Sequence, residues 1–556
     1  MVRLGRLRFA QSLLITALAL ASGCSGCNQK PTEAPTRWLS QAAEIVVEIP
    51  DITAPTKKNA LLRDRVEGII TKEQYDAAVG EVKRVLGFDP TTAEGLAAAG
   101  LPASGAVAGE IIEGGRGGFW VIPCADKAKL EKTITDVIKS RSNIDETKDE
   151  AIEGGKLLIF LSSWGTEKVP VAAFTIQKGY AFVGAGKKAA ELVKQALVRK
   201  KEESLEALPA YASLVKSTVP DAVVRILVPQ AKVIMDRLGP DAPKEGFAAA
   251  VESTAWSITL DEKSLAVIGR VRFTPAVDKD VQAMFSAGGK VPPGVLATLS
   301  PEAVLTVLGA GDVTKFLAGV APPSTQLGRD VENVFTAFKS DTGLDVRTQI
   351  IPAMSGHSAF AIGIGDLKGL SDVRTFLMTP AKFLWSSTSL GLKSAEDGKK
   401  LSLMSKDLDP AFERRGLVRE QRKLKDLDVE MVKLKTPLEG QDPLLMESAV
   451  VGGAWIITNT AGETERAVTA AATAGTDPLG GKGGAIVELR VAPLAAAIRA
   501  VDLAQLAGGA EGMIIRTIVG RALALMDRLS KIEARIEPAG EGVLLSLRLN
   551  FAPVKK

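Results

Sequence analysis

Only one histidine, His357, occurs in the 556-residue chain, and this limits the chemistry that the chain can perform. A single imidazole excludes any site that needs several histidines for a metal and leaves at most one histidine for acid–base catalysis. His357 lies between Gly356 and Ser358, directly before the apolar stretch 359–364. We interpret it as a polar residue at the edge of a strand rather than as a catalytic base.

Two further patterns have spacings that occur in known active or binding sites. Gly184, Gly186 and Ala189 match the Gly-x-Gly-x-x-Gly/Ala fingerprint of dinucleotide-binding loops. The strand before them, 180–183, is expected to belong to an antiparallel hairpin, whereas dinucleotide binding needs a parallel strand–helix–strand unit. We therefore interpret these glycines as residues of a strand-to-helix turn.

Ser213 and Lys216 have the Ser-x-x-Lys spacing of penicillin-recognising serine enzymes. The chain has no Ser-Asp-Asn, and it carries Lys435-Thr436-Pro437 where those enzymes have Lys-Thr-Gly. We therefore expect no catalytic, metal-binding or cofactor-binding residues. A hydrolase whose acids or serines meet only in three dimensions stays open as a third hypothesis.

The segment 413–435 concentrates charges of both signs, including Arg419, Arg422 and Glu420. A solvated helix or loop is the simplest interpretation. The alternative is a basic surface that contacts anionic lipid headgroups, although the mixed signs would make that contact weak.

The N-terminus has the pattern of a secretory signal. Arg3, Arg6 and Arg8 precede an apolar run, Ala10–Ala21, that is too short to span a bilayer. The segment ends in Leu20-Ala21-Ser22-Gly23-Cys24, which resembles the lipobox of bacterial lipoproteins. The resemblance implies that residues 1–23 are a signal peptide and that Cys24 becomes the acylated N-terminus.

This resemblance implies a membrane-anchored lipoprotein of the cell envelope. Each buried methylene of the acyl chains contributes about 0.8 kcal/mol to membrane binding. The non-acidic residue Ser25 implies, by the same resemblance, the outer membrane, facing the periplasm or the cell surface. The alternative is an ordinary signal peptide that is cut near Ala21 or Gly23.

Charge and cysteine content limit the partners and the disulfides. Loss of Arg3, Arg6 and Arg8 with the signal lowers the net charge from +4 to about +1, too small a basic excess for a nucleic-acid partner. Cys27 and Cys124 could pair in an oxidising compartment. Because Cys124 follows the apolar stretch 119–122, we expect a buried, inert thiol there.

The mature chain begins with a polar, proline-containing tether, 24–37, and then alternates strands and helices. Residues 43–49 have the period of a strand with one buried face. Asp126 is expected to cap a helix over 127–139, and the polar segment 140–153 is expected to be a charged loop. Further strands are expected over 106–112, 119–122, 156–161, 169–176, 180–183 and 221–228, and helices over 61–86, 187–198 and 229–238.

The same order then starts again. Gly87 and Asp89 match Gly343 and Asp345, and the alternating hairpin arm 265–273 matches 543–551 in register. These matches predict a tandem duplication with a period of about 260 residues. We expect two α+β repeats, 38–285 and 295–556, each with a twisted antiparallel sheet covered by helices, joined by a glycine- and proline-rich linker, 286–294.

This plan resembles a family of secreted bacterial proteins of unknown function that also carry paired helix-and-hairpin units, and the resemblance implies no activity. The leading hypothesis is a non-enzymatic envelope lipoprotein that acts as a binding or structural scaffold for a protein partner. The alternative is a periplasmic carrier of lipid or another apolar ligand in a cavity between sheet and helices.

Overall fold

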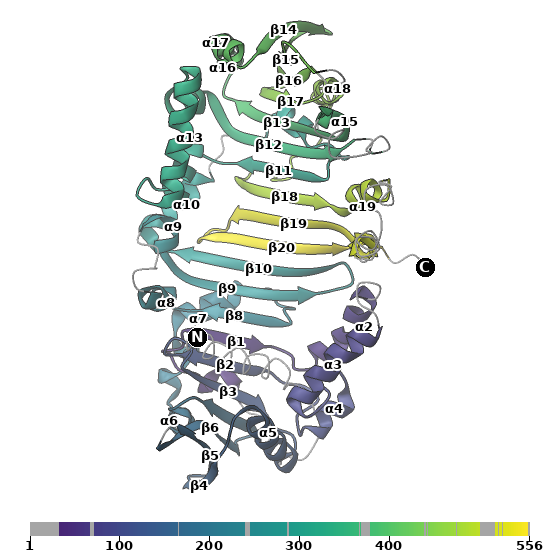
Figure 1. The fold of residues 1–556 in the computed structure, drawn as a ribbon. Helices are drawn as coiled ribbons and strands as arrows, with labels where there is room; N and C mark the ends of the chain where they lie inside the picture. The colour runs from purple at the N-terminus through teal and green to yellow at the C-terminus, as the bar shows by residue number, and fades with distance from the viewer. Residues whose placement is uncertain are drawn as a thin grey trace. The chain divides into compact units, whose positions relative to one another are not determined.

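The computed structural model describes residues 33–553 apart from 67–71, 165, 239–244, 286–288, 366, 368–377, 439–440, 442, 474, 501–517, 521 and 525. The signal peptide, Cys24 and most of the expected tether lie outside the described residues. Contacts divide the chain into two compact units (Figure 1). Unit 1 comprises Met1–Ala242 and Val251–Arg272, and unit 2 comprises Pro243–Ala250 and Phe273–Lys556.

The described strands of unit 1 form a sheet in the order β4-β5-β6-β7-β3-β2-β1-β8-β9-β10. Neighbouring strands from β4 to β9 are antiparallel. Their bounds are β1 Ile45–Ile49, β2 Val107–Ile112, β3 Gly117–Pro123, β4 Glu146–Ile152, β5 Gly155–Trp164, β6 Glu167–Gln177, β7 Tyr180–Ala185, β8 Val224–Val228, β9 Val251–Leu260 and β10 Ser264–Phe273.

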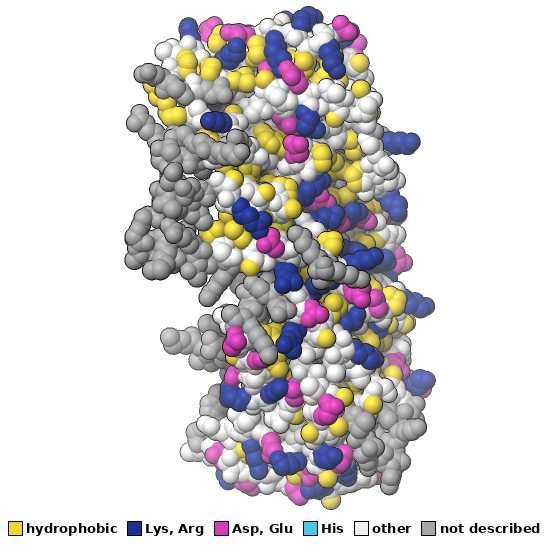
Figure 2. Space-filling model, turned by 90° about the vertical axis from the view of Figure 1, so that its right-hand side faces the viewer, with side chains coloured by type: hydrophobic (Ala, Val, Ile, Leu, Met, Phe, Trp, Pro, Cys, Tyr) yellow, Lys and Arg dark blue, Asp and Glu magenta, His cyan; other side chains and the backbone are white. Residues whose placement is uncertain are grey.

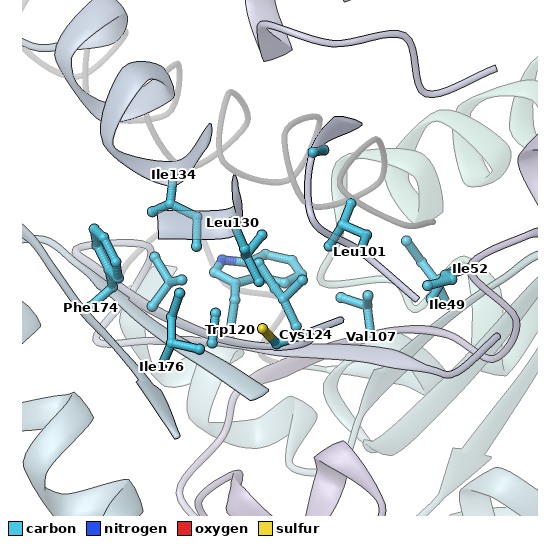
Figure 3. Packing of buried hydrophobic residues seen from close by; sticks show 14 of the residues in the cluster. Ile49, Ile52, Leu101, Val107, Trp120, Cys124, Leu130, Ile134, Phe174 and Ile176 are labelled. Atoms are coloured by element: carbon cyan, nitrogen blue, oxygen red, sulfur yellow. The ribbon is translucent and has the colours of Figure 1, made fainter. Parts of the chain in front are cut away.

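Helices cover both faces of this sheet. On one face, Leu96 of α4 and Leu130 and Ile134 of α5 pack on Trp120 and Phe174 (Figure 3). On the other face, helices α6 and α7 and the short turn η1 enclose a second apolar core. The bounds are η1 Pro35–Trp38, α2 Ala54–Val66, α3 Lys72–Leu86, α4 Ala93–Ala98, α5 Lys127–Arg141, α6 Ala189–Val198, η2 Lys201–Glu203, η3 Leu205–Ala207, α7 Pro209–Lys216 and α8 Ala231–Leu238.

The described strands of unit 2 lie in the order β14-β15-β16-β17-β13-β12-β11-β18-β19-β20, and all neighbours are antiparallel. Position for position, this is the strand order of unit 1. The bounds are β11 Leu305–Ala310, β12 Met354–Ile364, β13 Leu384–Leu392, β14 Leu417–Leu424, β15 Leu427–Leu434, β16 Leu444–Val451, β17 Ala454–Thr458, β18 Gly484–Arg490, β19 Leu529–Pro538 and β20 Val543–Phe551.

Helices of unit 2 occupy similar places in the chain order. Helices α11 and α18 bury Val295 and Ala467 against one face of the sheet, and α16 buries Leu401 on a separate, smaller core. The bounds are α9 Gly246–Ala249, α10 Pro275–Met284, α11 Pro293–Thr298, α12 Val313–Val320, α13 Gln326–Thr342, η5 Val346–Ile350, η6 Ile351–Ala353, α15 Pro380–Phe383, α16 Ala395–Ser405, η8 Lys406–Leu408, α17 Asp409–Arg414, α18 Ala461–Ala470 and α19 Val491–Ala500.

The prediction of mixed helix and antiparallel sheet is confirmed, and the expected cap at Asp126 is present, since its side chain accepts a hydrogen bond from the N–H of Lys129 at 3.1 Å. The division between the units falls at 272/273, before the predicted linker 286–294. Helix α10 accounts for this difference, because it buries Val281 and Met284 against Val543 within unit 2.

Two charged segments form strands that the sequence analysis did not predict. The expected loop 140–153 contains β4, and the expected helix or loop 413–435 contains the hairpin β14–β15, which turns at Lys425 with φ 56°. Strands β4 and β14 each lie at an edge of their unit's strand order. Charged side chains are typical of edge strands, where they discourage pairing with another chain.

The start of unit 1 is more buried than expected. Strand β1 is buried on both faces, and Glu44 and Glu48, expected on a solvent face, are only 5% and 7% exposed. The end of the expected tether is also packed, because Thr36 is buried and the Tyr180 hydroxyl donates to the carbonyl of Glu33 at 2.6 Å. The short elements η1 to η3 cover this face of β1 and so exclude water from it.

Candidate functional site

A hollow of about 540 Å³ opens in unit 2 where β11 ends and α12 begins. This volume lies in the range of small-molecule pockets, about 300–1,000 Å³. The hollow is formed by the junction of β11 with α12, the turns η5 and η6, the start of β12 and the end of β13. Its lining residues that carry charge or a hydrogen-bonding side chain are Lys290, Asp312, Thr314, Arg347, Ser355, His357 and Lys393.

His357 lies at the buried side of this hollow, with 1% of its surface exposed. Its Nδ1 lies 3.1 Å from the Ser355 hydroxyl, and burial lowers the pKa of the imidazole. The ring also hydrogen-bonds the backbone of Gly289. The nearby carboxylate of Asp477 instead accepts from the N–H groups of Leu479 and Gly481, at 2.9 and 2.8 Å. This is not the geometry of a serine–histidine–aspartate relay.

The rim of the hollow is positively charged. Lys290, Arg347 and Lys393 are exposed side chains that line it, against a single acid, Asp312. The Asp312 side chain is occupied as the cap of α12, where it accepts from the N–H of Lys315 at 3.1 Å. Arg347 pairs with Glu332 and lies over the ring of Phe335, 5.3 Å from its centroid. Within the described chain, Lys290 and Lys393 have no ion-pair partner.

Matching hydrogen bonds identify the corresponding place in unit 1. In unit 2 the N–H of Gly311 donates to the carbonyl of Gly356 at 2.9 Å, and in unit 1 the N–H of Ile52 donates in the same way to the carbonyl of Gly105. A second pair of bonds matches: the N–H of Lys393 donates to the carbonyl of Ala353 at 3.0 Å, and the N–H of Ala125 donates to the carbonyl of Gly100.

A third match lies after the long helices α3 and α13. The carboxylate of Asp89 accepts from Thr91 N–H at 2.9 Å, and that of Asp345 accepts from Arg347 N–H at 3.0 Å. Each aspartate also pairs with a lysine of the preceding helix, Lys83 at 2.6 Å and Lys339 at 2.9 Å. These hydrogen bonds around the hollow therefore recur in unit 1, although unit 1 has the helix α4 where unit 2 has η5 and η6.

The side chains at these equivalent positions differ in kind. Unit 1 buries Ile52 and Ala125, which are 0% and 5% exposed. Leu101 and Val107 belong to the same apolar core as Ile52 (Figure 3). Unit 2 has Gly311 and Lys393 at the positions of Ile52 and Ala125. It also has Arg347 at the position of Thr91. One unit thus packs a core where the other has a charged hollow.

A second hollow of about 380 Å³ also lies in unit 2, between α16 and strands β15 to β17. Its lining combines apolar residues such as Trp455, Val450 and Leu427 with the acids Asp428 and Glu430. Glu430 accepts from the Ser402 hydroxyl at 3.1 Å and lies 3.5 Å from Arg419. Ion pairs and hydrogen bonds at the wall make this hollow a poor match for a purely apolar ligand.

Unit 1 contains buried acids that line neither hollow. Burial raises the pKa of Glu110 to about 7, although the Arg199 charge and the N–H of Ser40, at 2.6 Å, favour its ionised form. Burial likewise raises the pKa of Glu48, against the opposing hydrogen bond from the Tyr211 hydroxyl. The turns η1 to η3 and helix α7 close this face, so we interpret the cluster as structural.

Gly186 lies in the turn between β7 and α6, as predicted, whereas Gly184 is a residue of strand β7. Strand β7 is antiparallel to both β3 and β6, so the parallel unit that dinucleotide binding requires is not formed. Gly186 has φ 93°, and a Cβ at Gly184 would lie 2.3 Å from the carbonyl oxygen of Ala189. Gly184 is required by close approach to the start of α6, and Gly186 by close approach to the carbonyl of Arg116.

Ser213 and Lys216 do not form a catalytic pair. The Ser213 hydroxyl accepts from Arg272 Nη2 at 2.6 Å, and Lys216 is exposed at the end of α7.

In the segment 413–435, Arg422 forms an ion pair of 2.9 Å with the buried Glu447. This pairing weakens the alternative that the segment is a lipid-binding surface, and Figure 2 shows basic and acidic side chains interspersed over the visible face.

The expectation of an inert thiol at Cys124 is wrong. Cys124 is buried in the core of unit 1 (Figure 3). It is disulfide-bonded. The other two cysteines of the chain, Cys24 and Cys27, lie outside the described residues, as does the predicted lipidation of Cys24. The apolar neighbours of Cys124 predict burial correctly but do not reveal its oxidation state.

Sequence reasoning missed the cations of the hollow. Lys290, Arg347 and Lys393 are far apart in the chain, and none belongs to a recognised motif. The signal that could have found Arg347 is the match of Asp89 with Asp345, because extending that alignment by two residues places an arginine opposite Thr91. Lys393 becomes comparable with Ala125 only through the backbone hydrogen bonds.

Comparisons with known proteins assign no family. No protein-family model and no curated protein match the chain. Structures of the protein TP0453 align with it at a TM-score of 0.25: crystal form III at 12% identity over 47% of this chain and 90% of that chain, and crystal form I at 11% identity over 46% and 88%. A TM-score this low does not support a shared fold.

The described residues contain no cluster of three or more His, Cys, Asp or Glu side chains suited to a metal ion. None of the described helices is long and apolar enough to cross a membrane.

Proposed function

We propose that the chain is a non-enzymatic lipoprotein of the cell envelope, anchored through Cys24, that acts as a binding or structural scaffold. In this proposal the two units derive from a tandem duplication. Their identical strand order and the hydrogen bonds that recur at equivalent positions support a common origin.

The observation that carries the proposal is the difference between the two units at one equivalent place. Unit 1 is packed there with Ile52 and Leu101, whereas unit 2 has a hollow of about 540 Å³ at the same place. We assign the structural role to unit 1 and the binding role to unit 2. Duplication allows such a division, because one copy can keep the stable core while the other exchanges core residues for polar ones.

The location in the envelope is supported by the disulfide of Cys124 and by the signal-like N-terminus. Structural disulfides persist in oxidising compartments such as the bacterial periplasm and are rare in the cytosol. The outer membrane remains the proposed site of the anchor, on the resemblance of the residue after Cys24 to a sorting signal.

The carrier alternative requires a large, continuous apolar cavity. Both hollows of unit 2 instead have charged residues in their walls, Lys393 and Arg347 in one and Glu430 and Asp428 in the other. The cores of unit 1 are filled by buried apolar side chains. These features favour the scaffold over a carrier of bulky lipid.

Native mass spectrometry of the chain from Ser25 onward, exported to a bacterial periplasm without acylation, tests the choice. A scaffold should give the mass of the bare protein or of a defined oligomer. An additional mass that denaturation releases as intact lipid would contradict the scaffold and establish a carrier.

A further inference from the structure

The hollow beside His357 combines a neutral, hydrogen-bonding floor with a cationic rim. Ser355 and His357 form the floor, and Lys290, Arg347 and Lys393 form the rim. Arg347 is paired with Glu332, but Lys290 and Lys393 have no ion-pair partner within the described chain, and the one acid of the lining, Asp312, caps α12. The hollow therefore has an excess of positive charge. We propose that it binds a compact oxyanion, a phosphate group carried by a small molecule or by a lipid headgroup. This inference rests on the proposed role of unit 2 as the binding unit.

Two of these charges, those of Lys393 and Arg347, are specific to unit 2 and are not needed for the hydrogen bonds that both units share. At the equivalent positions unit 1 has Ala125 and Thr91, yet it makes the same backbone hydrogen bonds. Lysine and arginine side chains are costly to bring together without a counter-ion. Lys290 and Lys393 line the hollow without an ion-pair partner in the described chain, and an anionic occupant would supply the missing counter-ion.

The first turn of α12 strengthens the same preference. Gly311, Val313 and Thr314 line the hollow, so the positive end of this helix is directed at its contents. A bound phosphate could accept from the threonine and serine hydroxyls and from the lysine ammonium groups.

Glu332 acts as an internal competitor. It pairs with Arg347 in the structure, and both side chains are 41% exposed. A phosphate that approaches the arginine must share it with this carboxylate. Removing the carboxylate charge should therefore free Arg347 and strengthen phosphate binding, which a surface of unrelated lysines would not show.

The test is isothermal titration of inorganic phosphate into the chain from Ser25 onward, which retains every described residue, with sodium chloride at matched ionic strength as the reference. The wild type should bind phosphate saturably with one site per chain. Lys290→Ala/Lys393→Ala should weaken binding by about tenfold or more, because two charge-assisted contacts are lost. Glu332→Gln should strengthen it, and Lys400→Ala, an exposed lysine of α16, should leave it unchanged.

Flotation with vesicles distinguishes the two sources of phosphate. If the natural ligand is a headgroup, phosphatidylglycerol vesicles should bind the wild type more than phosphatidylcholine vesicles, and the double variant should lose this preference. If it is a soluble phosphate, the titration should show saturable binding, and the wild type should not float preferentially with phosphatidylglycerol vesicles.

Absence of saturable binding in both assays, or equal binding by wild type and the double variant, would overturn the proposal. That outcome would exclude a phosphate group as the ligand. It would leave the proposed scaffold function standing, because native mass spectrometry tests that function separately.

Discussion

At the scale of single residues, the most consequential feature of unit 1 is the buried carboxyl of Glu110. Glu110 is 1% exposed on β2, on the face that carries Val46 of β1. Burial raises its pKa from the ordinary 4.5 to about 7. The folded state therefore holds this proton to a higher pH than the unfolded state does. The proton's contribution to the free energy of unfolding is complete below about pH 4.5 and is lost as the pH rises through 7.

Glu110→Gln should remove this pH dependence. The amide oxygen can still accept from the N–H of Ser40, but the side chain no longer ionises. We expect the variant to be more stable than wild type at pH 8 by up to about 3 kcal/mol, with the difference shrinking towards zero near pH 4. Urea unfolding at a series of pH values measures this difference. Glu153→Gln, at an exposed position, controls for the substitution itself. Equal stability of Glu110→Gln and wild type at pH 8 would contradict this prediction, because it would show that the fold offsets the cost of burying the ionised carboxylate.

At the scale of elements, alternating apolar patterns located most strands, whereas charged edge strands were missed. The arms 265–273 and 543–551 correspond closely to β10 and β20, and the helix capped by Asp126 is α5. Strand β4 was missed because its sequence, Glu146–Ile152, is mostly polar and solvent-exposed. What identifies it as a strand is its pairing with β5, a tertiary interaction that local composition does not report.

Close packing between neighbouring strands gives a prediction at the same scale. Gly109 of β2 lies opposite Trp120 of β3, and a Cβ at this glycine would lie 2.0 Å from the indole ring. Gly109→Ala must therefore displace a buried tryptophan and should destabilise the protein by about 1–3 kcal/mol. Gly155→Ala in β5, where a Cβ meets open space, is the matched control and should change the urea midpoint little. Similar midpoints for the two variants would contradict the packing that the structure gives.

At the scale of the whole molecule, the sequence suggested a repeated plan but not how the copies differ. The match of Gly87 and Asp89 with Gly343 and Asp345 falls at equivalent ends of α3 and α13, where the glycines have φ 73° and 78°. The hollow of unit 2 could not be predicted, because it is lined by residues that are far apart in the chain and meet only after the sheet has formed.

The cysteines provide a prediction on how the chain is attached. Cys124 is disulfide-bonded, and only Cys24 and Cys27 remain as partners in a chain with three cysteines. If acylation uses Cys24, Cys27 must be the partner. Peptide mapping of the membrane-bound protein without reduction should find an acylated Cys24 and a Cys27–Cys124 link. Finding Cys24 joined to Cys124 would contradict lipid anchoring and support an ordinary signal peptide.

The central claim is that two units of the same strand order divide the work, with unit 2 as the binding unit. Hydrogen-exchange mass spectrometry of the chain from Ser25 onward, with and without saturating phosphate at matched ionic strength, tests it most directly. We predict added protection in peptides that cover 311–314, 347–357 and 392–393, and none in the equivalent segments 52–54, 91–106 and 124–125. Protection confined to unit 1, or equal in both units, would contradict the division of roles.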